Sequence, residues 1–295
     1  MSFSDMKQRS KTNLASLIKE TEKISNPKTG FSDTDDRFWR PELDKSGNGY
    51  AVVRFLPAPE GEDLPWARIW NHGFQGPGGW YIENSLTTLG QKDPVSEHNS
   101  TLWNSGIEAN KEVARKQKRR LNYTANVYIL KDPAHPENEG TIKLYRFGKK
   151  IFDKINDLMN PEFEDESPVN PFDLWAGANF KMKIRKIEGY SNYDKSEFEV
   201  PSALLEDEAR LEEIWKSESS LKELVSEDKF KTFDELKTKL ERVLGLGSEF
   251  SSTPKSVDVP FDGGKPYTAP PKPAVESTND GDESMDYFQK LAQEA

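Results

Sequence analysis

The chain has 295 residues, a net charge of −10, a mean hydropathy of −0.84 and 34% hydrophobic residues, enough apolar content for a packed core beside exposed polar segments. The absence of cysteine excludes disulfide scaffolds, thiol nucleophiles and Cys-based zinc sites, and three histidines leave little for histidine chemistry. No apolar run reaches the ~18 residues of a membrane span, and charges interrupt the first 20 residues, so we expect a soluble intracellular protein without a membrane partner.

The chain begins with a predicted flexible arm over residues 1–30. A short helix is predicted there, because Leu14, Leu17 and Ile18 lie at helical spacing.

A strand-rich core is predicted over residues 31–250. Strands are predicted at 50–56, 67–74, 80–83, 122–131, 141–147 and 178–187. Helices are predicted at 149–159, 202–215, 219–226 and 230–244. Strands that precede a group of helices, with one helix between them, favour a mainly β, α+β fold built on a small antiparallel barrel over a doubly wound sheet.

The end of the chain has a different composition. Six prolines predict an extended linker over 251–275, and the last segment, 276–295, is an acidic tail with six acids and one lysine.

The charge is unevenly arranged along the core. Residues 111–154 hold twelve Lys and Arg against five Asp and Glu, a local charge of +7, whereas residues 197–228 hold eleven acids and three bases. A basic surface is therefore predicted within an acidic protein, and this keeps a nucleic-acid partner possible.

Cations and aromatic residues recur together in the run that starts at Arg115 and in three later segments. Cations can contact phosphates, and exposed aromatic rings can stack on bases, which together are typical of single-strand binding. The candidate binding residues are Arg115, Lys116, Lys118, Arg119, Arg120, Tyr123, Tyr145, Arg146, Lys149, Lys150, Lys183, Arg185, Tyr190 and Tyr193. The alternatives are a solvated basic surface and ordinary packing of the tyrosines, and Phe147 is expected in the core.

Several longer motifs make the sequence recognisable. They are GNGYAVVRFLP at 47–57, NHGF at 71–74, WYIE at 80–83, KDPAHPENEG at 131–140, YRFGKKI at 145–151 and SNYD at 191–194. In this order they resemble the single-stranded-DNA-binding, helix-destabilising protein of T-even-like bacteriophages. The resemblance is best over 47–194 and only compositional after Pro254.

The resemblance implies an OB-fold core with an inserted subdomain at about 71–118 and a helical region at about 202–245. It implies a cleft for single-stranded DNA, self-association through the arm, and recruitment of phage polymerase, helicase loader and recombination mediator by the tail, in the cytoplasm of the infected bacterial host. The implied self-association residues are Lys7, Arg9 and Lys11. The implied tail residues are Asp280, Asp282, Glu283, Asp286, Phe288 and Leu291.

The same resemblance implies a zinc ion held by one His and three Cys in the inserted subdomain. His72 keeps the His position, whereas Ser85, Val95 and His98 stand at the Cys positions. This set does not complete a tetrahedral zinc site, so we expect no metal and no other cofactor. Aromatic packing is expected to hold the subdomain instead, through Trp70, Trp80, Tyr81 and Trp103.

The function favoured by these observations is cooperative coating of single-stranded DNA, without sequence preference and without catalysis, during phage replication, recombination and repair. Two alternatives remain at this stage. One is an enzyme that acts on nucleic acid with Asp or Glu bound to a metal ion, although neither a P-loop nor an HExxH motif is present. The other is an acidic scaffold that binds only proteins.

Overall fold

The computed structural model describes residues 35–163 and 165–246, so the predicted arm, linker and acidic tail lie outside the described residues. The strands are β1 (Phe38–Trp39), β2 (Gly49–Phe55), β3 (Ala67–Gly76), β4 (Gly79–Asn84), β5 (Arg120–Lys131), β6 (Ile142–Phe147), β7 (Asn179–Ile187), β8 (Tyr190–Asn192) and β9 (Glu197–Phe198). The α-helices are α2 (Pro94–Asn104), α3 (Glu108–Gln117), α4 (Lys149–Met159), α5 (Glu208–Lys216) and α6 (Phe233–Leu244). Short 3-10 helices are η1 (Leu86–Leu89), η2 (Pro136–Asn138), η3 (Lys222–Val225) and η4 (Glu227–Lys229). Across the described ranges, the helices are too short or too polar to cross a bilayer.

The strands form one mixed sheet in which neighbours follow the order β1-β6-β5-β2-β7-β8. Strand β3 pairs with β5 and β4, and all pairs are antiparallel except β1 with β6. In the described ranges, no ladder joins β1 or β6 to β7 or β8. The α+β class is confirmed, but the sheet is open, so closure into an OB-fold barrel is not shown.

The sequence predicted the six longer strands and α4 to within two residues. It missed α2 and α3, and it predicted helices at 202–215 and 219–226 where the structure has only α5 and η3. Helix α2 does carry a start signal, because Asp93 caps it and Pro94 occupies its first turn. Helix α3 carries little hydrophobic signal, since Ala114 is its one buried apolar residue.

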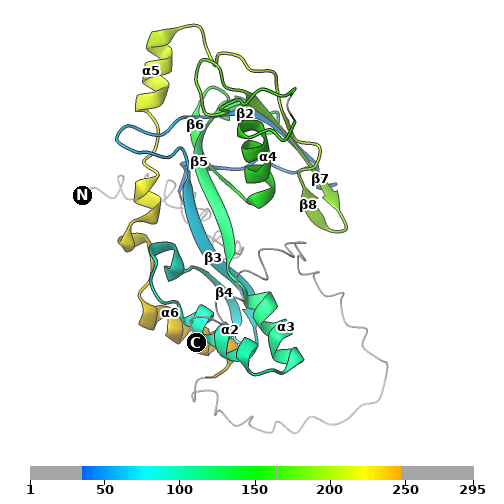
Figure 1. The fold of residues 1–295 in the computed structure, drawn as a ribbon, viewed down its shortest axis with the longest axis vertical. Helices are drawn as coiled ribbons and strands as arrows, with labels where there is room; N and C mark the ends of the chain where they lie inside the picture. Colours follow the sequence, from blue (N-terminus) through cyan, green and yellow to red (C-terminus); the bar gives the residue numbers. More distant parts are fainter. Residues whose placement is uncertain (1–34, 164, 247–295) are drawn as a thin grey trace, which may run out of the picture. The chain divides into compact units, whose positions relative to one another are not determined.

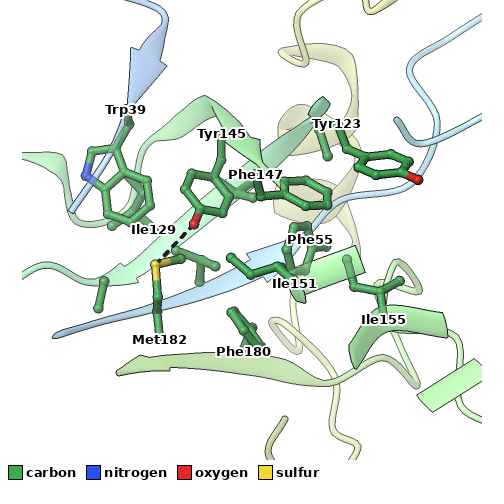
Figure 2. Close-up of a cluster of buried hydrophobic side chains, with 14 of the residues drawn as sticks. Trp39, Phe55, Tyr123, Ile129, Tyr145, Phe147, Ile151, Ile155, Phe180 and Met182 are labelled. Atoms are coloured by element: carbon green, nitrogen blue, oxygen red, sulfur yellow. Dashed lines mark hydrogen bonds between the residues drawn. The ribbon is translucent and has the colours of Figure 1, made fainter. Parts of the chain in front are cut away.

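The main core lies on one face of the sheet. Residues of β2 and β7 that alternate along their strands point into it, and α4 covers it with Ile151 and Ile155. A series of ring contacts runs through this core: Trp39 to Tyr145 at 5.6 Å, Tyr145 to Phe147 at 5.6 Å, and Phe147 to Tyr123 at 5.8 Å between centroids. Figure 2 shows these rings beside one another, with the Tyr145 hydroxyl directed at Met182.

Strands β3 and β5 extend from the core sheet to the elements β4, α2, α3 and α6 (Figure 1). We call the paired segment Ala67–Asn71 with Arg120–Thr124 the ribbon. Beyond it, Phe74, Tyr81 and Val95 pack against Leu236 and Leu240 of α6 in a second core. We call residues 71–118, which hold β4, α2 and α3, the inserted region. It is held partly by α6, a helix that lies more than a hundred residues later in the chain.

The aromatic packing expected for this region is only partly found. Tyr81 is fully buried and stacks on Phe74 at 5.1 Å, whereas Trp80 is 49% exposed. Trp103 is half-buried beneath the side chains of Lys111 and Arg115.

The segment 218–230 packs on the sheet face opposite the main core. Leu221 and Leu224 contact the cluster of Ala67, Ile69 and Leu144. Glu62 holds this segment by accepting hydrogen bonds from the Leu221 and Lys222 amides at 3.0 and 3.2 Å.

The carboxyl group of Glu218 lies near that of Glu62 but differs from it in hydrogen bonding. Both carboxyl oxygens of Glu218 are buried and have no hydrogen-bond partner within the described ranges. Burial, with a smaller contribution from the charge of Glu62, raises the pKa of Glu218 to about 9.

Candidate nucleic-acid interface

One face of the ribbon gathers cations and aromatic rings. Register pairs Arg68 with Tyr123 and Trp70 with Leu121, so these side chains share a face, and alternation places Arg119 on the same side. We call this set the ribbon face. It adjoins the main core, because the ring of Tyr123 stacks on Phe152 of α4 with centroids 3.9 Å apart and planes 4° apart.

The Arg119 guanidinium lies over the indole ring of Trp70, with its central carbon 4.5 Å from the ring centroid. A guanidinium over an indole face is attracted by the ring quadrupole, and the Arg119 side chain is half-buried there. Arg68 is exposed two residues before Trp70 on the same strand face. Two cations and a large ring thus lie together on an extended backbone.

Tyr145 is not part of this surface. It is 3% exposed, its hydroxyl donates to the Met182 sulfur at 3.4 Å, and burial, with a smaller contribution from Tyr193, raises its pKa. This corrects the expectation that Tyr145 stacks on a base, because the core already encloses its ring (Figure 2). Tyr123 is 7% exposed, so Phe152 covers most of the ring that was expected to stack. Phe147 is buried as expected.

Arg120 and Arg146 point away from the ribbon face. Arg120 pairs with Asn71, and Arg146 pairs with Thr124. These residues belong to the other alternate set on their strands, which faces segment 218–230. The Arg146 guanidinium lies 5.1 Å from the Phe38 ring centroid, and burial lowers its pKa. Sequence reasoning placed Arg120 and Arg146 in one site with Arg119 and Tyr145. Because neighbouring strand residues point to opposite faces, Arg120 and Arg146 lie on the other side of the sheet from Arg119 and Tyr145.

Four of the other basic candidates lie on helices. Arg115 contacts Glu108 at 2.9 Å and also pairs with Glu112 on α3, and Lys116 is exposed near the end of that helix. A further pair begins α4, where Lys149 contacts Asp153 at 3.1 Å and Lys150 is exposed. Lys118, the residue after α3, is half-buried.

Three cations of β7, at alternate positions, lie on one strand face, as the alternation predicted, but each of the three meets a carboxylate. Lys181 contacts Glu199 at 2.8 Å, Lys183 contacts Glu197 at 2.6 Å, and Arg185 pairs with Asp194. Hydrogen bonds from Arg185 and from Lys183 lower the pKa values of Asp194 and Glu197, respectively. The two nearby aromatic candidates, Tyr190 and Tyr193, are half-buried, and Tyr193 packs against the main core.

Sequence reasoning missed Trp66 and Arg68, and it expected Trp70 only to pack within the inserted subdomain. The pattern W-x-R-x-W at 66–70 places two rings and a cation on one strand face, so period-2 alternation was a usable signal. Trp66 also extends the ring contacts of the core, at 5.5 Å from Phe152.

Comparison with known proteins assigns the chain to a family. Residues 47–244 match the family model described as gp32 DNA binding protein like. The chain belongs to this gp32-like family. It is 42% identical over 254 residues to a protein named single-stranded DNA-binding protein from Enterobacteria phage T2 and to one from phage T4, with 83% of each chain covered. A shorter relative of the same name, from Escherichia phage SV14, is 44% identical over 86 residues, which cover 28% of this chain.

In this gp32-like chain, the positions implied for zinc surround a carboxylate. His72 and Ser85 are buried and contact Asp93, and Val95 contributes a backbone amide to it. The fourth position, His98, is half-buried. Within the described ranges no three His, Cys, Asp or Glu side chains form a metal-binding group. The residues present therefore do not fit a zinc ion, since a serine and a valine replace thiolates.

Proposed function

We propose that this chain binds single-stranded DNA along the ribbon face, with little preference for sequence. The observation that carries the proposal is the Arg119 guanidinium over the Trp70 ring, with Arg68 exposed beside them. Guanidinium groups bind phosphates, and aromatic faces stack on any base, so the pair serves both parts of a nucleotide. Membership of the gp32-like family and the names of the phage T2 and T4 relatives support the same function.

Binding of this kind needs no catalytic group. A protein that binds only the open strand lowers the free energy of that strand and so shifts duplex DNA toward strand separation. Bases in a duplex are stacked on each other and are not available to Trp70. We therefore propose a non-enzymatic protein that coats and protects single strands during phage replication, recombination and repair in the bacterial host cytoplasm.

The finer organisation is proposed on the resemblance. It comprises an OB-fold core with an inserted subdomain at about 71–118, and cooperative self-association through Lys7, Arg9 and Lys11. It also includes binding of phage replication and recombination proteins by the acidic tail, through Phe288 and Leu291 among its residues. These arm and tail residues lie outside the described residues.

The test is a tryptophan fluorescence titration with oligo-dT at several salt concentrations. We expect the logarithm of affinity to fall linearly with the logarithm of salt, with a slope near −0.7 for each phosphate neutralised. Labelled single strand kept with the protein and Mg²⁺ should remain intact. Absence of salt-sensitive binding, or cleavage of the strand, would contradict the proposal.

Self-association has a separate test. Deleting residues 1–21 should leave affinity for an oligonucleotide that holds one protein nearly unchanged and should sharply reduce affinity for a long strand. Equal losses on both lengths would show that the arm contacts DNA instead of a neighbouring protein.

A further inference from the structure

A buried polar cluster lies where four segments of the inserted region meet. His72 comes from β3, Ser85 follows β4, Asp93 precedes α2, and Gln117 ends α3. His72, Ser85 and Asp93 are each at most 1% exposed. A buried carboxylate in such a place needs donors on every side to offset the loss of water.

Asp93 has those donors. One carboxylate oxygen, Oδ1, accepts hydrogen bonds from the Val95 and Ser96 amides, both at 3.0 Å. The other, Oδ2, accepts from the Ser85 hydroxyl at 2.9 Å and the Leu86 amide at 3.1 Å. These contacts join the loop after β4 to the start of α2 through one side chain.

His72 completes the cluster from a third segment. Its Nε2 lies 3.2 Å from Asp93 Oδ1, a close contact without strict hydrogen-bond geometry. Its Nδ1 lies 3.0 Å from the Gln117 carbonyl oxygen, which can only accept, so Nδ1 carries a proton. Burial alone would raise the pKa of Asp93, but the contacts with His72, Ser96 and Ser85 outweigh it and lower that pKa to about 2.

Three of the four positions implied for zinc therefore converge on Asp93: His72 by its ring, Ser85 by its hydroxyl, and Val95 by its amide. The charge arrangement is inverted relative to a metal centre. A cation surrounded by thiolates is replaced by an anion surrounded by donors. Three segments are joined in either case: β3, the loop after β4 and the start of α2.

The cluster also reaches the candidate interface. The carbonyl that His72 contacts belongs to Gln117, and the next two residues are Lys118 and Arg119. Fixing the end of α3 fixes where β5 begins, and hence where Arg119 meets Trp70.

We infer that the Asp93 carboxylate replaces the metal ion as the structural centre of the inserted region. His72 connects this centre to the basic run at residues 115–120, so Asp93 and His72 are positioning residues for DNA binding. The second half rests on the proposed function.

The first experiment uses the full chain without DNA. Metal analysis should find far less than one zinc per chain, and neither a chelator nor added Zn²⁺ should shift the melting temperature. The variant Asp93→Asn should melt roughly 10 °C lower, because its amide nitrogen cannot accept the hydrogen bonds that one of the buried carboxylate oxygens accepts. The matched control is Asp207→Asn, since Asp207 caps α5 through the Ala209 and Arg210 amides but is exposed.

The second experiment measures oligo-dT binding at a temperature where circular dichroism shows each variant folded. Asp93→Asn should bind about 10-fold more weakly with a salt slope flatter by about 0.7, equivalent to one lost phosphate contact. Asp207→Asn should match the wild type. If Asp93→Asn does not fold, His72→Gln provides the same comparison with the carboxylate retained.

The results separate the two halves. Stoichiometric zinc whose removal lowers the melting temperature, or equal melting of the two Asn variants, would overturn the Asp93 centre. An unchanged affinity and slope in folded Asp93→Asn and His72→Gln would overturn the positioning role. If the wild type does not bind DNA, the proposed function fails while the metal and melting results still decide the first half.

Discussion

Two strand faces of this protein carry cations, and the surroundings of those cations differ. On β7, each of Lys181, Lys183 and Arg185 contacts a carboxylate. On the ribbon face, the Arg119 guanidinium lies over an indole ring and Arg68 is exposed. Strand spacing decides which face a cation occupies, but the neighbouring elements decide how much of its charge is available to a phosphate.

The acids that pair with the β7 cations come from the chain just after β8. Asp194 lies in the following turn, and Glu197 and Glu199 lie in and beside β9, which pairs with β7. These carboxylates form ion pairs with the β7 cations, as the phosphates of DNA would. Exposed ion pairs contribute about 0–1 kcal/mol, so a polyanion can compete with them, but it must first displace the internal acid.

The largest expected effect is on the ribbon face. The double variant Arg68→Gln with Arg119→Gln should lose about 10- to 100-fold in affinity for oligo-dT at low salt, with a salt slope flatter by about 1.4. Arg210→Gln, on α5, removes an exposed guanidinium elsewhere and should bind as the wild type does. A double variant with an unchanged slope would show that these cations do not contact phosphate.

Trp70→Leu should weaken binding by roughly 10-fold, because a stacked base contributes ~1–3 kcal/mol, while the salt slope changes little. Trp175, which is 56% exposed and donates to Glu208, provides the matched control as Trp175→Leu. Titrations on oligo-dT and oligo-dA check both variants. Equal losses for the two variants would refute a specific stacking role for Trp70.

Removing the acids tests the β7 side of the comparison. The double variant Asp194→Asn with Glu197→Gln should bind a few-fold more tightly at low salt and show a steeper slope, because Lys183 and Arg185 no longer have internal partners. The effect should vanish near 1 M salt. Unchanged binding at low salt would show that bound DNA does not contact the β7 face.

Tyr145→Phe should have the smallest effect. Loss of the hydroxyl contact with Met182 should cost less than about 1 kcal/mol of stability, measured by denaturant unfolding, and affinity for DNA should not change. A marked loss of affinity would show that the core opens to expose this ring.

These comparisons show what the sequence could and could not predict. Strands such as 67–76 have apolar or β-branched alternation that is a local property, so their positions followed from the residues. The burial of Tyr145 did not, because α4 and β7 cover its face only in the folded sheet. The neutralisation of Lys183 likewise depends on the pairing of β9 with β7, a contact between separate segments.

Part of the candidate interface could be predicted from the sequence. Sequence reasoning named the cations of residues 115–120 as candidates, but α3 holds part of that run and strand alternation divides the rest between two faces. The same rule of alternation, applied to residues 66–70, would have identified Arg68 and Trp70. The Asp93 centre was beyond sequence reasoning, since it joins residues of four segments whose approach only the fold specifies.

The buried Glu218 beside Glu62 has a consequence for the proton content of the protein. Its pKa is about 9 in the folded chain against an ordinary 4.5, so near neutrality the folded form holds about one proton that the unfolded form releases. The folded charge is then one unit less negative than the formal −10. Folding stability present below pH 4.5 is lost progressively as the pH rises toward 9. Because the buffer takes up the proton released on unfolding, unfolding enthalpies measured in two buffers should differ by about the difference between the ionisation enthalpies of those buffers.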